Sequence, residues 1–199
     1  MAGRNFLDVT RSARGFAWRD RLGPQREGMA SALSQRLGLP DALARLLAAR
    51  GVGVEEAEGH LDPTLRALMP DPRGMTDMEA ASDRLAVAVE RGEKVAIFGD
   101  YDVDGACSAA LLSDYLEQVG AESIIHIPDR IFEGYGPNVA AIEALAAQGA
   151  RLLVTVDCGT TSFEPLAHAR ALGLDVIVLD HHQAPEALPG VTALVNPNR

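Results

Sequence analysis

Acidic side chains and histidines follow three short apolar runs between residues 95 and 179, VAIF, LLVTV and VIVL. The residues that follow these runs, in order, are Asp100, Asp102 and Asp104, then Asp157, then Asp180, His181 and His182. Carboxylates and imidazoles without thiolates suit Mn²⁺ or Mg²⁺ better than a structural zinc site. The pattern therefore predicts a divalent-cation site, on condition that the three runs end side by side.

The elements around these residues predict an α/β fold with a doubly wound, mainly parallel sheet. Strands are expected over 94–98, 123–128, 151–156, 175–179 and 192–195, and helices over 106–119, 137–147 and 161–172. Such alternation is typical of βαβ units, and Val/Ile/Leu-rich runs fit strands that are covered on both faces. Ligands bind at the carboxyl ends of such strands, so we expect all the acids at one rim.

Single acids at strand ends have simpler explanations than a cation site. A lone Asp after a strand usually caps the next helix. The Asp-x-Asp-x-Asp spacing also fits a calcium loop, but the twelfth position counted from Asp100 is Leu111, so the EF-hand pattern fails. Acids at three strand ends, one with a His-His pair, favour the cation site, because cations offset the repulsion between crowded carboxylates.

Small residues beside the acids predict contacts to a phosphate group. Gly105 permits a close backbone approach, and Ser108 is expected in the first turn of the next helix, where free N–H groups attract anions. Gly159 repeats this design after the second run. Thr161 and Glu164 also fit a capping box, so helix capping is an equally good explanation for this segment.

The first 75 residues form a separate segment in our prediction, and residues 76–199 form the α/β domain. Residues 1–35 mix Gly, Arg and polar residues without periodicity, which predicts a loosely structured arm. Helices are expected over 40–50 and 54–60, and a further helix over 78–91 leads into the first strand.

The composition excludes some classes of protein. The net charge of −10 argues against a passive nucleic-acid-binding module more than against a metal-dependent nuclease, because bound cations reverse the local charge. No apolar run approaches the roughly 18–20 residues of a membrane span, which predicts no membrane partner. Cys107 and Cys158 form no disulfide framework and are expected as small buried side chains in the reducing cytoplasm.

The ordered motifs resemble the DHH phosphoesterase family. They are GDYDVDG at 99–105, VDCG at 156–159 and the DHH triplet at 180–182 that gives the family its name. The segments PDRIFEGYG at 128–136, VNPN at 195–198 and LDPTLRALMPDP at 61–72 are similar to the RecJ group within that family. The resemblance covers nearly the whole chain from about residue 40.

This resemblance implies a metal-dependent 5′-to-3′ exonuclease that hydrolyses phosphodiester bonds of single-stranded DNA in repair and recombination. It also implies two Mn²⁺ or Mg²⁺ ions, and the ligands implied by position are Asp102, Asp104, Asp157 and His181. Asp100 and Asp180 are implied to support the cluster, and His182 to face the scissile phosphate or to orient a ligand.

Arg130, with Tyr135 nearby, is implied to contact the phosphate or the DNA end. A salt bridge from Arg130 to Asp129 or Glu133 is an equally good interpretation of that segment.

Members of the family continue beyond the VNPN motif with a further aspartate ligand, the rest of the catalytic domain and a DHHA1 domain. The resemblance thus implies an incomplete metal site and leaves open whether these 199 residues are active by themselves. A single-strand-binding protein is expected to bind through regions outside this chain.

Two other functions stay open. Other DHH hydrolases act on short oligonucleotides, cyclic dinucleotides or pyrophosphate, and they usually carry a His where Phe98 stands. A non-catalytic DHH scaffold is the second alternative, although such relatives lose metal ligands that are all present here.

Overall fold

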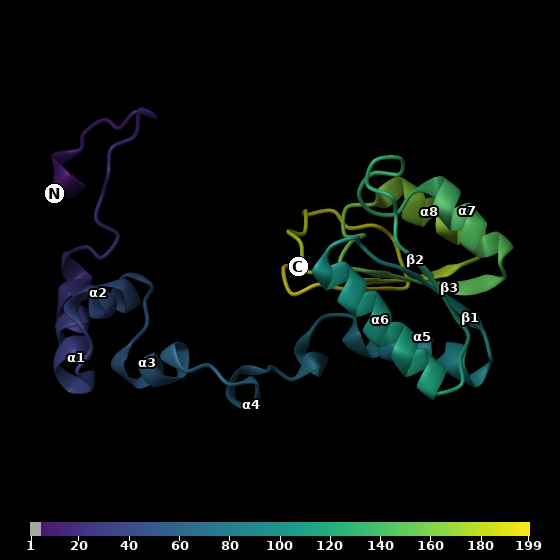
Figure 1. Cartoon of the computed structure of the whole chain (residues 1–199), viewed down its shortest axis with the longest axis horizontal. Helices are drawn as coiled ribbons and strands as arrows, with labels where there is room; N and C mark the ends of the chain where they lie inside the picture. Colours follow the sequence, from purple (N-terminus) through teal and green to yellow (C-terminus); the bar gives the residue numbers. More distant parts are fainter. Residues whose placement is uncertain (1–4) are drawn as a thin grey trace. The chain divides into compact units, whose positions relative to one another are not determined.

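Figure 1 shows the computed structural model of the chain, which describes residues 5–199. The chain divides into two compact units, Met1–Pro70 and Asp71–Arg199. This division falls in the proline-rich stretch around Pro70 and Pro72, a few residues before the boundary that we predicted after residue 75. The first four residues of the predicted arm lie outside the described residues.

The unit that ends at Pro70 is helical. Its helices are α1 (Glu27–Leu37), α2 (Asp41–Ala49), α3 (Val54–Leu61) and the short α4 (Leu65–Leu68), with 3-10 turns at Phe6–Asp8 and Pro24–Arg26. The predicted helices over 40–50 and 54–60 are confirmed. The predicted loose arm is wrong for residues 27–37, because α1 buries Ala30 and Leu33 in the small core of this unit.

The second unit is built on a five-stranded sheet with the order β2-β1-β3-β4-β5. The strands are β1 (Lys94–Phe98), β2 (Ser123–His126), β3 (Ala150–Val156), β4 (Asp175–Leu179) and β5 (Ala193–Val195). Every neighbouring pair is parallel. The predicted doubly wound parallel sheet is therefore confirmed.

Four helices cover the two faces of this sheet (Figure 1). They are α5 (Met78–Glu90) and α6 (Val103–Gln118) on one face and α7 (Val139–Ala147) and α8 (Phe163–Ala171) on the other. Successive residues of a strand point to opposite faces. Val95 and Ile97 accordingly join the core under α5 and α6, while Ala96 and Phe98 join the core under α7 and α8.

Some helix boundaries differ from the prediction, and a short 3-10 turn, Pro72–Gly74, precedes α5. The expected capping box of Thr161 and Glu164 is wrong, because α8 begins at Phe163 and its N-cap is Ser162, without a side-chain capping hydrogen bond. Within residues 5–199 no helix is both long enough and apolar enough to cross a membrane.

The register of the sheet sets polar residues in one row beyond the strand ends. Phe98 pairs with Thr155, Val156 with Leu179, and Leu179 with Val195. Two backbone hydrogen bonds continue this pairing past the strands, from N–H of residue 157 to O of 179 (2.9 Å) and from N–H of 180 to O of 195 (3.0 Å). The residues of this row are Asp100, Asp157, Asp180 and Asn196.

Candidate metal centre

Two overlapping groups of side chains stand at the carboxyl ends of β1, β3 and β4. The potential ligand atoms within each group all lie within 4.8 Å of one another. One group is Asp100, Asp102 and Asp157, and the other is Asp157, His181 and His182. Asp157 belongs to both groups and is therefore the centre of the rim. The topology brings together the acids of three separate strand ends, as the sequence analysis expects.

Asp157 occupies a buried and strained position. Its φ is +61°, a left-handed conformation that costs a residue other than glycine on the order of 1–3 kcal/mol. Its Oδ1 lies 2.9 Å from Nε2 of His181, whereas its buried Oδ2 has no hydrogen-bond partner. Burial, followed by the neighbouring Asp102 carboxylate, raises the pKa of Asp157. The protein groups around Asp157 therefore disfavour the charged form of this central carboxylate.

Asp100, like Asp157, has a carboxylate oxygen that lacks a hydrogen-bond partner. Its Oδ1 is also buried without a partner, so two of the three such side-chain atoms within residues 5–199 are carboxylate oxygens of this rim. A buried polar atom without a partner is costly. A divalent cation would supply the missing partner for such oxygens, and carboxylates with imidazoles form a donor set that Mn²⁺ and Mg²⁺ accept. The residues present thus fit a divalent cation.

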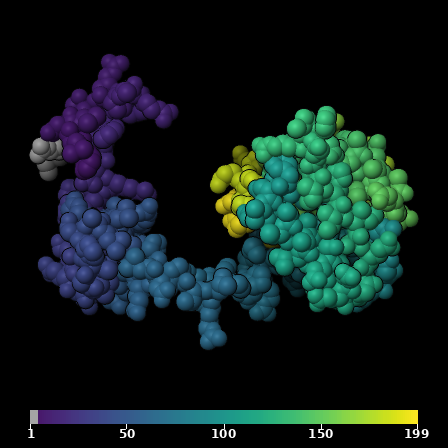
Figure 2. Space-filling model, in the orientation of Figure 1, coloured from purple at the N-terminus to yellow at the C-terminus, as the bar shows by residue number. Residues whose placement is uncertain are grey.

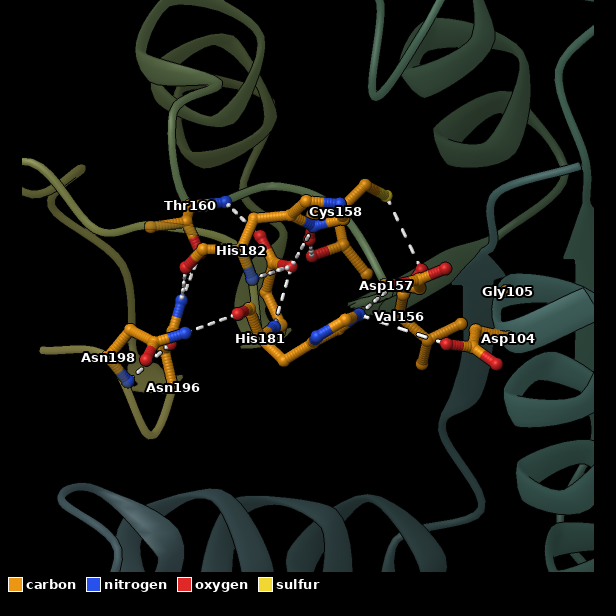
Figure 3. A network of polar contacts seen from close by, with 12 residues as sticks. Asp104, Gly105, Val156, Asp157, Cys158, Thr160, His181, His182, Asn196 and Asn198 are labelled. Carbon is orange, nitrogen blue, oxygen red and sulfur yellow. Dashed lines mark hydrogen bonds and ion pairs between the residues drawn. The ribbon is translucent and has the colours of Figure 1, made fainter. Parts of the chain in front are cut away.

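The first turn of α6 forms the opposite side of the rim. Asp102 is the N-cap, and its Oδ1 accepts a hydrogen bond from N–H of Gly105 at 3.0 Å, which lowers its pKa. Asp104 is exposed, and its Oδ2 lies 4.0 Å from Nε2 of His181, outside both ligand groups (Figure 3). A Cβ on Gly105 would lie 2.5–2.7 Å from the backbone of Asp100, so only glycine permits this approach of α6.

The early start of α6 corrects the prediction for Ser108. Because Asp102 caps a helix that begins at Val103, Ser108 lies in the second turn, where its N–H is an internal helix donor and not free for an anion. Ser108 instead lines a cavity of about 420 Å³ beside the rim, together with Cys107, which is exposed and not buried as expected. Val195 also lines this cavity, and Figure 2 shows the C-terminal residues in yellow beside the teal of α6.

Asp180 is a buried carboxylate with full hydrogen bonding. Its Oδ2 accepts from N–H of Thr160 at 3.0 Å. Its Oδ1 accepts from N–H of His181 at 2.7 Å, from N–H of His182 at 3.1 Å, and pairs with Nδ1 of His182 at 2.7 Å. Burial opposes ionisation, but the hydrogen bonds from Thr160 and His182 outweigh it and lower the pKa of Asp180 to about 2. The contact with Asp180 in turn raises the pKa of His182.

Tyr135 links the segments that follow β3 and β4. Its hydroxyl donates to the backbone O of Asp157 at 3.2 Å and lies 3.3 Å from Nδ1 of His182. The two rings meet edge to face, with centroids 5.9 Å apart. Burial, with nearby carboxylates, raises the pKa of Tyr135, so the phenol stays protonated.

Arg130 lies beside the first motif. Its guanidinium stands 4.5 Å from the ring centroid of Tyr101, a cation–π contact. Neither of the alternative salt bridges, to Asp129 or Glu133, is formed in the part of the chain that the structure describes. Glu133 instead accepts from N–H of Asp129 at 2.7 Å and pairs with Nε2 of His126 at 3.0 Å. Arg130 itself is exposed.

Our sequence-based site omitted Thr160 and Asn196, which are 1% and 2% exposed. Nδ2 of Asn196 donates to Oγ1 of Thr160 at 2.9 Å. The VNPN motif contains Asn196, but its contact with Thr160 follows from the strand register, which sequence patterns alone do not provide. Gly159 has a φ of +108°, and a Cβ there would lie 2.5 Å from Oγ1 of Thr155, so this turn requires glycine. Its expected contact with phosphate stays a prediction.

Comparisons with known proteins agree with this geometry. A sequence profile described as "DHH family, N-terminal domain" matches residues 94–199. The chain is 38% identical over 167 residues to the single-stranded-DNA-specific exonuclease RecJ of Bacillus subtilis, a match that covers 84% of this chain and 21% of that protein. It is 37% identical to the Escherichia coli protein of the same name, covering 80% and 27%. The chain thus spans about a fifth to a quarter of these relatives.

Two solved structures are also similar. The crystal structure of exonuclease RecJ bound to manganese superposes with a TM-score of 0.59 at 31% identity, over 64% of this chain and 33% of that one. The structure of RecJ from Thermus thermophilus in complex with Mn²⁺ gives a TM-score of 0.64 at 26% identity, over 85% and 23%. Both structures hold manganese and share the fold of this chain.

Proposed function

We propose that this chain, which belongs to the DHH family, carries the metal centre of a 5′-to-3′ exonuclease that hydrolyses single-stranded DNA. The observation that carries the proposal is the buried, unpartnered Oδ2 of Asp157 at the meeting point of two groups of ligand side chains. The names of the relatives support the substrate class, since they are single-stranded-DNA-specific exonucleases. We place the activity in cytoplasmic DNA repair and recombination, with a single-strand-binding protein as a further partner.

Mn²⁺ or Mg²⁺, as two ions, fits the carboxylates and imidazole of this rim. The residues that hold them in our proposal are Asp102, Asp104, Asp157 and His181, with Asp100 beside them. When bound, such ions act as Lewis acids on the phosphodiester and lower the pKa of the attacking water. The ions also remove the cost of the unpartnered oxygens of Asp100 and Asp157.

The remaining residues of the rim orient the substrate and supply a proton. Asp180 orients the ring of His182 through Nδ1 and raises its pKa, which favours the imidazolium form that would donate a proton to the leaving oxygen. Tyr135 limits the movement of this ring from its other side. Arg130 makes no ion pair within the described residues and offers its guanidinium to a phosphate of the DNA end.

Release of nucleotides from 5′-labelled single-stranded DNA with Mn²⁺ tests the proposal. We expect Asp157→Asn to reduce release by at least about 100-fold, because it removes the central ligand. Asp114→Asn, an exposed carboxylate on α6 that pairs with Gln118, is the matched control and should leave release unchanged.

Where the unaltered chain releases nucleotides, equal release by the Asp157 variant would contradict the proposal. A strong preference for di- or trinucleotides over longer single strands would point to another class of DHH hydrolase.

A further inference from the structure

We propose that Asn196 and Asn198 are positioning residues that hold the main chain of His181 and His182 and so set the two imidazoles of the metal centre. This inference rests on the proposed function, because it concerns the geometry of the same site. Neither asparagine touches a candidate metal ligand through that ligand's side chain, so both act through the backbone.

The amide of Asn196 is fully used in this arrangement (Figure 3). Its Nδ2 donates to Oγ1 of Thr160 and to O of His182, both at 2.9 Å, and its Oδ1 accepts from N–H of Asn198 at 2.8 Å. Asn198 in turn donates from Nδ2 to O of His181. Two consecutive carbonyl groups of the DHH segment therefore each receive a side-chain amide.

The side-chain amides of Asn196 and Asn198 continue the pairing of β4 and β5 beyond the last hydrogen bond between their main chains. β4 ends at Leu179 and β5 at Val195, and the bond from N–H of Asp180 to O of Val195 is the last between their main chains. Strand ends without partners open readily. The side chains of residues 196 and 198 replace the missing ladder for residues 182 and 181, and thus keep the DHH segment in the register of the strands.

Packing alone does not fix the two imidazoles. The side chains of His181 and His182 are 59% and 49% exposed, so few atoms surround them. The ring of His181 contacts Asp157 at 2.9 Å, and the ring of His182 contacts Asp180 at 2.7 Å and the hydroxyl of Tyr135 at 3.3 Å. The position of each ring therefore depends on where its own backbone lies.

Thr160 closes the network. Its N–H donates to Oδ2 of Asp180, and its hydroxyl accepts from Asn196. Three segments, 157–160, 180–182 and 196–198, are thus joined through buried polar atoms. Loss of the amide of Asn196 frees the hydroxyl of Thr160 and the carbonyl of His182 together.

Mn²⁺ itself is the probe. Electron paramagnetic resonance gives its affinity, and pulsed measurements detect the ¹⁴N modulation that imidazole imposes on a bound ion. We expect Asn196→Ala to weaken Mn²⁺ binding about tenfold or more and to reduce the modulation per bound ion, as loss of supporting contacts to metal ligands does. A role limited to stability would lower the Tm and leave the modulation per bound ion unchanged.

Asn138→Ser is the matched control. Asn138 caps α7 through Oδ1, which accepts from N–H of Ala141 at 2.8 Å, and serine keeps a capping acceptor without placing a second carboxylate beside Glu133. We expect the control to retain both affinity and modulation. Because Asn196 is buried, its replacement also disturbs the packing around it. Asn198→Ala, at an exposed position, is therefore tested beside it, with an expected loss of affinity of several-fold.

The outcomes separate the two proposals. If the unaltered chain binds Mn²⁺ with ¹⁴N modulation and the folded Asn196 and Asn198 variants match it, the positioning role is wrong while the metal centre stands. If the unaltered chain itself shows no bound ion with ¹⁴N modulation, the metal centre is wrong and the positioning role fails with it.

Discussion

Asp157 and Asp180 follow neighbouring strands, occupy neighbouring places in the row beyond the sheet, and are both almost fully buried. Their environments nevertheless shift the pKa values of the two carboxyl groups in opposite directions. Asp180 accepts hydrogen bonds on both oxygens, and its pKa falls to about 2. Asp157 has an oxygen without a partner and lies beside Asp102, and its pKa rises.

The difference separates a structural carboxylate from one that requires a cation. Burial disfavours the charge of both groups, and only the donors around each decide the result. Four polar hydrogens stabilise the charge of Asp180 without any ion. Asp157 receives one imidazole contact, which is outweighed by burial and by the like charge of Asp102, so a bound cation would supply the compensating charge that its ionised form lacks.

The largest expected effect is stabilisation by Mn²⁺. A ligand at 100 times its Kd stabilises the folded state by about 2.7 kcal/mol, which corresponds to a rise in Tm of about 5–10 °C. Asp157→Asn should abolish this rise in thermal unfolding followed by circular dichroism, and Asp114→Asn should preserve it. A full rise in the Asp157 variant would place the cation elsewhere.

The second largest effect is on the free energy of unfolding in the absence of a metal ion, where substitution of Asp180 and of Asp157 should have different consequences. Asp180→Asn should lower the free energy of unfolding by about 2 kcal/mol, because its pKa falls from 3.8 to about 2 and each pKa unit corresponds to about 1.4 kcal/mol. Asp157→Asn should cost less than about 1 kcal/mol or stabilise the chain, because a neutral amide removes the repulsion from Asp102.

Urea unfolding in the presence of a chelator measures both variants. Equal destabilisation by the two substitutions would remove the distinction between these carboxylates.

The smallest expected effect is that of removing the Tyr135 hydroxyl, which links Asp157 to His182. Tyr135→Phe removes contacts to O of Asp157 and to Nδ1 of His182, and should cost about 1 kcal/mol of unfolding free energy. Tyr115→Phe, an exposed tyrosine on α6, is the control and should change the stability by less than about 0.5 kcal/mol. A cost above that of Asp180→Asn would mean that the hydroxyl, and not the carboxylate, organises this side of the rim.

The sequence was sufficient for the sheet and for the gathering of its acids. Apolar runs marked the strands, and the rule for parallel sheets placed Asp100, Asp157 and Asp180 at one rim before any geometry was known. The helix α1 was missed because Gly28 and Ser34 interrupt its short apolar pattern. The strands were predicted because their apolar runs are continuous, and α1 was missed because its apolar pattern is interrupted.

Other features depend on contacts that no local pattern contains. Ser108 was misplaced by one turn because Asp102 serves as the N-cap, which moves the start of α6 towards the rim. The role of Asn196 depends on the register between β4 and β5, and the stacking of Arg130 on Tyr101 depends on the path of a loop. Sequence patterns specify elements, whereas pairing between elements specifies these contacts.

A crystal of the chain grown with Mn²⁺, measured at the manganese absorption edge, tests the central claim most directly. The account predicts an anomalous peak in contact with Oδ2 of Asp157, the buried oxygen that has no hydrogen-bond partner within residues 5–199. Full occupancy of other sites with no peak at Asp157 would contradict it.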